Sequence, residues 1–366
     1  MTIDFLNATK GHAVILNFST IPAWLFKTGN PVTFPSDADQ ATWSYTQGKE
    51  LVEGGLPELA DYYAYLVSWY ANGGFTDRQG NRQVSNFHFK TPYWEVFNEP
   101  ESEHGMSPQD YTARYDAVVA AIHAVSPETK FVGLALGAPG QNLEMFEYFL
   151  DPKNHRPGIP LDMISYHFYA MVQSETPEDW QNTLFDQADG FLATVRSIEQ
   201  MRKRLSPETR TDLDEIGSVL PGAPAMKMIP AVYWNASGAL YAYVYLQTMR
   251  MGVDVVGESQ LVGYPTQFPS VSMLDWKTGS PNARFWVLKL IHDHLAPGDK
   301  FVETRGATSD LLAQAFATPM GRALLLVNKR NAKIAVRLKE AWKDAAGVGG
   351  RFRRGRAYND AGRAHA

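Results

Sequence analysis

The feature that most constrains the fold of this chain is a regular alternation of short apolar segments with longer amphipathic ones. Each strand-like segment is followed by a segment with helical spacing of apolar residues, and Gly, Pro, Asn or Ser breaks separate them. Six such units can be traced. The predicted strands cover residues 12–18, 93–97, 130–136, 161–168, 210–215 and 253–258, and the predicted helices cover 59–71, 108–125, 143–150, 188–205, 236–251 and 282–294.

The predicted strands are short and almost continuously apolar, which is typical of a parallel sheet covered by helices on both faces. Two α/β architectures fit six βα units: a doubly wound sheet, and a TIM (β/α)8 barrel that lacks its first two units. Periodicity does not separate them. The placement of polar residues at the strand ends favours the N-terminally incomplete barrel.

The pattern changes after residue 297. Residues 301–305, 311–317 and 322–328 have the composition of antiparallel strands separated by Gly, Asp and Pro turns. We therefore expect a barrel domain over residues 1–297, a small β-rich appendage or partial β-sandwich over 298–344, and a disordered Gly/Arg/Ala-rich tail over 345–366.

Composition excludes several classes of function. The net charge of −5 leaves no broad basic surface, so we expect no nucleic-acid partner. The absence of cysteine excludes thiol catalysis, disulfides and zinc–thiolate sites. Every apolar run is broken by charge or proline before it reaches the length of a membrane span, so no membrane partner is expected. The start, Met1-Thr-Ile-Asp-Phe-Leu6, lacks the features of a signal peptide.

Chemically capable side chains gather where the predicted strands end, which is where barrel enzymes place their catalytic groups. These residues are Asn98, Glu99, His167, Tyr169, Glu215 and Glu258. Any single glutamate at such a position has a structural alternative, a salt bridge to the helical shell. A pair of carboxylates, one protonated and one ionised, is what cleavage of a glycosidic bond requires. The set as a whole favours catalysis.

One of these segments, Trp94-Glu-Val-Phe-Asn-Glu-Pro100, resembles the Asn-Glu-Pro motif of the large retaining glycosidase clan, and more narrowly glycoside hydrolase family 39, which contains β-xylosidases and α-L-iduronidases. Ser165-Tyr-His-Phe-Tyr169 is similar to the His-x-Tyr of the same family, and Asp214-Glu-Ile-Gly217 lies where its nucleophile strand belongs. The similarity extends over about residues 11–295.

This resemblance implies a role for each matching residue. Glu99 would be the acid/base and Asn98 would contact the sugar 2-hydroxyl. Glu215 would be the nucleophile, oriented by His167 and Tyr169. Glu258 would be a substrate-contacting carboxylate. The mechanism needs no metal or organic cofactor.

Two departures from the family pattern stand out. Asp214 replaces a threonine before the nucleophile, and because neighbours on a strand point to opposite faces, we expect Asp214 to face the helix layer. The first predicted strand also corresponds to barrel strand three. We therefore expect this chain to be either a fragment or the product of a missed upstream start.

The expected activity is retaining hydrolysis of β-xylosides or related glycosides. One alternative is the same fold acting on another sugar: an iduronide, a glucoside or an exopolysaccharide. The loops after the last two predicted strands lie near three basic residues, Lys227, Lys277 and Arg284, so a uronate remains one of the alternative substrates. The other is a carbohydrate-binding remnant without turnover. Trp24 and Trp276 are candidate sugar platforms, with an ordinary core or rim position as the alternative reading of each.

Overall fold

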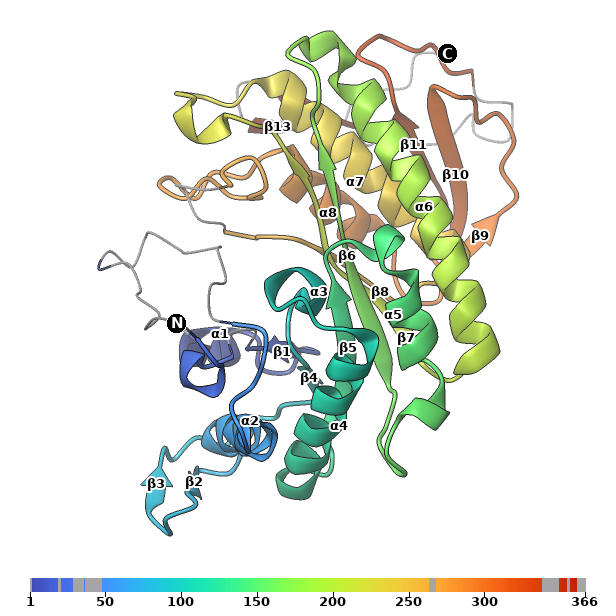
Figure 1. Ribbon diagram of the computed structural model, residues 1–366. Helices are drawn as coiled ribbons and strands as arrows, with labels where there is room; N and C mark the ends of the chain where they lie inside the picture. The colour runs from blue at the N-terminus through green and yellow to red at the C-terminus, as the bar shows by residue number, and fades with distance from the viewer. Residues whose placement is uncertain are drawn as a thin grey trace. The chain divides into compact units, whose positions relative to one another are not determined.

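The computed structural model describes residues 2–18, 21–28, 36, 48–262, 268–337, 349–353 and 356–360. Its main sheet has six parallel strands in the order β1-β4-β5-β6-β7-β8, with helices between them in the chain (Figure 1). A three-stranded antiparallel sheet, β11-β10-β9, follows. This is an incomplete TIM barrel with a small β appendage, so the predicted fold class is confirmed.

The chain divides into two compact units. Unit 1 comprises Met1–His167, Thr194–Asp214 and Val253–Val255, and unit 2 comprises Phe168–Ala193, Glu215–Gly252 and Val256–Ala366. The boundary passes through β6, α6, β7 and β8, so these elements belong partly to each unit. The two units are described separately below.

Unit 1 contains strands β1 to β5 and the helices that lie between them in the chain. Its complete elements are α1 (Thr2–Ala8), β1 (Ile15–Asn17), α2 (Gly55–Ala71), β2 (Gly74–Thr76), β3 (Arg82–Val84), β4 (Tyr93–Glu95), α3 (Pro100–Glu103), α4 (Pro108–Val125), β5 (Lys130–Leu136) and α5 (Leu143–Phe149), with 3-10 turns at Ala23–Leu25, Pro139–Gln141 and Pro152–Asn154. Helices α2 and α4 pack against each other (Figure 1). Large aromatic side chains such as Trp94, Tyr63 and Phe131 are fully buried in its core.

Unit 2 contains the later helices and the appendage. The elements that complete the chain are β6 (Met163–Met171), α6 (Trp180–Leu205), β7 (Arg210–Val219), α7 (Ala231–Met251), β8 (Val255–Glu258), α8 (Ala283–His294), β9 (Lys300–Val302), β10 (Leu311–Thr318), β11 (Gly321–Asn328), β12 (Gly349–Arg353) and β13 (Arg356–Asp360), with 3-10 turns at Pro177–Asp179 and Ala223–Ala225. Helices α7 and α8 pack together, and β11 contacts α7. Strands β12 and β13 pair antiparallel in the segment whose composition predicts disorder.

The structure moves several predicted boundaries. Helix α6 starts at Trp180, eight residues before the predicted start, because Trp180, Leu184 and Ala188 already bury one helical face. Strands β6 and β7 continue past their predicted ends, to Met171 and Val219. Tyr169, just beyond the predicted strand 161–168, therefore lies within β6, and His167 and Glu215 lie inside their strands, before the strand ends. No helix in the described ranges is long and apolar enough to cross a membrane.

Candidate active site

Glu99 lies just after β4 on an unusual stretch of backbone. Its φ and ψ are 38° and 51°, in the left-handed region that non-glycine residues rarely adopt. Phe97 also has a positive φ (67°), as do Leu134 (84°) and Ala135 (45°) at the end of the neighbouring strand β5. Each such residue costs on the order of 1–3 kcal/mol and persists only where its surroundings enforce it. Two adjacent strand ends are therefore held in conformations that set the direction of Glu99.

Specific contacts enforce this backbone. The Glu99 amide donates to the Ala135 carbonyl at 2.9 Å, which joins the two strand ends. The buried Tyr111 hydroxyl accepts from the Leu134 amide at 2.5 Å and donates to the Val96 carbonyl at 3.1 Å. It thereby replaces the ladder bonds that the irregular backbone cannot make.

Gly137 makes room for the Glu99 side chain. A Cβ built on this glycine would lie 2.5 Å from Glu99 Oε1, closer than real Cβ contacts allow. Gly137 is required because the Glu99 carboxylate occupies the space of a side chain.

The Glu99 carboxylate is hydrogen bonded on both oxygens. His167 Nδ1 lies 2.9 Å from Oε1, and the Ser102 hydroxyl donates to Oε2 at 3.3 Å. The Glu99 side chain keeps 31% exposure, whereas the His167 side chain has none. The other ring nitrogen, His167 Nε2, lies 3.3 Å from Asp214 Oδ2. A buried imidazole therefore joins Glu99 to a second carboxylate.

The expectation that Asp214 faces the helix layer is wrong. Its carboxylate meets His167 on the adjacent strand, and its charge reaches the buried carboxyl of Glu95. Asp214 therefore belongs to the polar group around Glu99.

A buried polar network that the sequence did not reveal lies among the same strands. Glu95 accepts from the Asn17 amide at 2.7 Å and from the Ser165 hydroxyl at 2.5 Å. Ser165 Oγ also accepts from the Ala135 amide at 3.1 Å, which supports the strained end of β5. Burial raises the pKa of Glu95 well above its ordinary value, and the nearby charge of Asp214 raises it further. A charged residue inside an apolar strand was the signal that could have found it.

Asn98 has a partner within the protein. Its Nδ2 donates to Glu103 Oε1 at 3.0 Å, and Glu103 closes the short helix α3 by donating its amide to the Glu99 carbonyl at 2.8 Å. This bond fixes the orientation of the Asn98 amide beside Glu99. The expected contact of Asn98 with a sugar hydroxyl stays a prediction.

Unit 2 brings together Tyr169 and Glu215. The Tyr169 hydroxyl donates to Glu215 Oε2 at 2.5 Å and lies 2.5 Å from Ser259 Oγ, from which it can accept. A Cβ built on Gly217 would lie 2.7 Å from the Tyr169 ring, so this glycine lets the ring lie against β7. A hydrogen bond from a phenol stabilises the ionised form of a carboxylate. The family resemblance implied that Tyr169 orients Glu215, and this hydrogen bond fits that role.

Glu258 is held in a buried ion pair with Arg284, and neither side chain is more than 1% exposed. Arg284 also donates to the Ile216 carbonyl at 3.0 Å. Burial raises the pKa of Glu258 to about 7, and Arg284 limits that rise. Substrate contact by Glu258 stays a prediction, and this burial argues against it. Arg284 was also one of the basic residues that could bind a uronate, and it forms this ion pair with Glu258 instead.

The two candidate sugar platforms, Trp24 and Trp276, are exposed to solvent. The Trp24 side chain is 66% exposed and meets Tyr62 edge-on with ring centroids 6.2 Å apart. Trp276 is 48% exposed in the loop before α8. Both rings have free surface, so they are not core residues, and their role as platforms stays a prediction.

Glu99, His167 and Asp214 are of the types that ligate transition metals. Both His167 nitrogens, however, already face carboxylate oxygens. A metal would have to displace one of these contacts, so the arrangement fits acid–base chemistry better than metal ligation.

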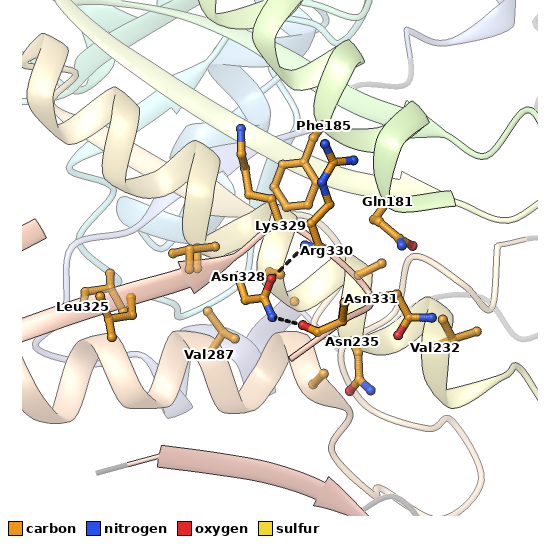
Figure 2. A pocket seen from close by; sticks show the side chains of 18 of the residues that line it. Gln181, Phe185, Val232, Asn235, Val287, Leu325, Asn328, Lys329, Arg330 and Asn331 are labelled. Carbon is orange, nitrogen blue, oxygen red and sulfur yellow. Dashed lines mark hydrogen bonds between the residues drawn. The ribbon is translucent and has the colours of Figure 1, made fainter. Parts of the chain in front are cut away.

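Unit 2 also contains a cavity that is lined by none of the candidate site residues. Its volume is about 620 Å³, and α7, α8 and β11 line it (Figure 2). The residues that line it are mainly apolar. Lys329 is one of its polar lining residues, and its ammonium group lies over the rings of Phe185 and Tyr243. None of its lining residues is Asp, Glu or His. This cavity therefore cannot supply an acid–base pair.

The fold is similar to those of solved glycosidases. A glucosidase from Croceicoccus marinus matches with a TM-score of 0.51 at 16% identity, over 86% of this chain and 57% of that one. A GH51 arabinofuranosidase from Xanthomonas axonopodis pv. citri matches with a TM-score of 0.55 at 12% identity, over 74% and 58% of the two chains. This chain thus spans somewhat more than half the length of these proteins.

A family 39 glycoside hydrolase from Bacteroides cellulosilyticus also matches, at 17% identity and a TM-score of 0.47, over 74% of this chain and 51% of that one. No protein family and no curated protein matches the sequence. These likenesses establish the barrel fold shared with glycoside hydrolases, and they do not select family 39.

Proposed function

We propose that this chain carries the catalytic machinery of a retaining glycoside hydrolase, with Glu99 as acid/base and Glu215 as nucleophile. The observation that carries the proposal is that the two glutamate carboxyls lie in different environments. Glu99 is directed by strained backbone and faces an imidazole, whereas Glu215 accepts a short bond from the Tyr169 phenol. Two carboxyls in different environments are the means by which such enzymes separate acid from nucleophile.

The mechanism follows from these roles. Glu215 attacks the anomeric carbon while Glu99 protonates the leaving oxygen, and the glycosidic bond breaks as the glycosyl–enzyme bond forms. Glu99 then takes a proton from water, which releases the sugar from Glu215 with net retention. Retention requires the two carboxyls to lie about 5–5.5 Å apart, and inversion would need about 6.5–9.5 Å.

For the substrate we propose a β-xyloside or a related glycoside, on the resemblance of the Asn-Glu-Pro and His-x-Tyr segments to family 39. The similar structures include a glucosidase and an arabinofuranosidase, so other sugars belong in the panel of test substrates. A carbohydrate-binding role without turnover is the alternative from another class of function.

The test is hydrolysis of a panel of aryl glycosides by the wild type and by Glu99→Ala and Glu215→Ala. Loss of the general acid should cost about 10²–10⁴-fold. Added azide should restore the activity of Glu99→Ala on activated aryl glycosides, because azide attacks the glycosyl–enzyme as a nucleophile that needs no general base and forms the glycosyl azide. Glu215→Ala should lose activity that azide does not restore with retention. Glu128→Ala, at an exposed position, is the control. Sugar binding without turnover by the wild type would support the non-catalytic alternative.

A further inference from the structure

Asp214 occupies an unusual position in unit 1. It directly precedes Glu215 on β7, yet its side chain faces His167 on β6, with Asp214 Oδ2 3.3 Å from Nε2. The opposite ring nitrogen, Nδ1, lies 2.9 Å from Glu99 Oε1. The imidazole is fully buried, and the Asp214 side chain is 15% exposed. One ring therefore connects Asp214 to Glu99.

We propose that Asp214 is a positioning residue that acts through His167 on Glu99; this inference rests on the proposed role of Glu99 as acid/base. An imidazole has two ring nitrogens, and a carboxylate that accepts from one of them determines what the other can do. With Asp214 accepting from Nε2–H, Nδ1 of the neutral ring is an acceptor. It then faces a protonated Glu99, which is the form that a general acid needs.

The same arrangement accommodates the second half of the reaction. Once Glu99 has given its proton to the leaving oxygen, it is a carboxylate, and a proton taken up from solvent at His167 Nδ1 makes the ring an imidazolium that donates to both carboxylates. When Glu99 regains a proton from the attacking water, His167 returns this proton to solvent, and the ring keeps its orientation throughout. Asp214 thus stabilises the ring in either protonation state of Glu99.

Other titratable groups of unit 1 surround this ring without replacing Asp214. Asp212, two residues earlier on β7, is buried, and desolvation together with the Asp214 charge raises its pKa to about 8. Asp212 is therefore largely protonated near neutral pH. Glu95 on β4 bonds to Asn17 and Ser165, and Arg210 bonds to Asp254. Asp214 is the β7 carboxylate that bonds directly to the imidazole.

The first test compares leaving groups. Asp214→Asn has nearly the same shape, but its amide can donate to Nε2 and so favours the reverse tautomer of His167. We expect kcat/KM for an aryl glycoside with a poor leaving group to fall about 10–100-fold, a part of the full general-acid contribution. For the 2,4-dinitrophenyl glycoside, whose departure needs no proton, kcat/KM should hardly change. For the poor leaving group, the basic limb of the pH profile of kcat/KM, which reports loss of the general-acid proton, should also shift.

The matched control is Asp212→Asn, the same substitution on the same strand face, which should leave the ratio of the two kcat/KM values unchanged. His167→Gln should reproduce the leaving-group signature, and combining it with Asp214→Asn should add little, because both remove one pathway. Equal losses with both leaving groups, or additive losses in the double variant, would overturn the proposal.

A second readout does not depend on turnover. In protein labelled with ¹⁵N-histidine, the ring-nitrogen shifts of His167, assigned with His167→Gln, should change in Asp214→Asn and stay as in the wild type in Asp212→Asn. Unchanged His167 shifts in a folded Asp214→Asn protein would contradict the inference. A wild type that turns over no glycoside but shows the expected shifts would instead count against the proposed function alone.

Discussion

At the scale of single residues, the proposed site depends on side chains that are missing as much as on those present. Gly137 and Gly217 leave the space that the Glu99 carboxylate and the Tyr169 ring occupy. Each glycine thus fixes the position of a group named from the sequence. Glycines of this kind are not recognisable from the sequence, because their importance depends on which side chain lies opposite.

Gly137→Ala should displace the Glu99 carboxylate, because the new methyl carbon would lie 2.5 Å from Oε1. A displacement of about 1 Å can cost ~10²-fold in rate, so we expect a loss of that order in kcat with the fold retained. Steady-state kinetics and circular dichroism would measure the two effects. Gly190→Ala, where the added carbon meets nothing within 4 Å, is the control. Full activity in Gly137→Ala would show that Glu99 does not need its observed position.

At the scale of elements, a short capping signal in the sequence predicted one helix start to the residue. Ser107 and Pro108 fix the start of α4, and the Ser107 hydroxyl accepts from the Asp110 amide as an N-cap should. The lengths of β6 and β7, by contrast, depend on pairing between strands distant in the sequence, which local composition does not report. That is why the face of Asp214 was mistaken while α4 was placed correctly.

Ser107→Ala should lower the free energy of unfolding by about 1 kcal/mol, since it removes the cap that satisfies the Asp110 amide. Chemical denaturation would measure the change. Gln109→Ala, an exposed substitution in the same turn, should have a much smaller effect. A Ser107→Ala protein as stable as the wild type would mean that water replaces the cap fully.

Strand β7 should impose a pH dependence on stability through Asp212. Burial raises the pKa of Asp212 from its ordinary 3.8 to about 8, so the folded chain keeps a proton that the unfolded chain has released. Stability should therefore fall as pH rises between about 4 and 8. Asp212→Asn should reduce this slope and raise the Tm most at pH 8.

The control for this slope is Asp310→Asn. Asp310 is exposed, and its ion pair with Arg330 lowers its pKa, so its smaller contribution has the opposite sign. Thermal unfolding between pH 4 and pH 9 would compare the variants. An Asp212→Asn protein with the same pH slope as the wild type would place the source of that slope elsewhere.

At the scale of the whole molecule, the alternation of strands and helices predicted six βα units and a β appendage, and the polar residues at the strand ends favoured an incomplete barrel over a doubly wound sheet. The motif residues Glu99, His167, Tyr169 and Glu215 were predicted because short motifs carry them. The supporting residues Glu95, Ser165 and Asp214 were not, since their roles arise from contacts between residues 47 to 78 positions apart on different strands. The substrate stays a prediction, because loops select the sugar and the fold is shared by many glycosidases.

The central claim is that Glu215 forms the covalent glycosyl–enzyme. Its most direct test is incubation with a 2-deoxy-2-fluoro aryl glycoside of each sugar that the chain hydrolyses, followed by peptide mass spectrometry. The 2-fluoro group slows both steps, and the activated aryl group lets the first one proceed. We predict release of one phenol and attachment of one fluoroglycosyl group to the peptide containing Glu215, with none in Glu215→Ala. Turnover with inversion and no label, or a label on another residue, would contradict the account.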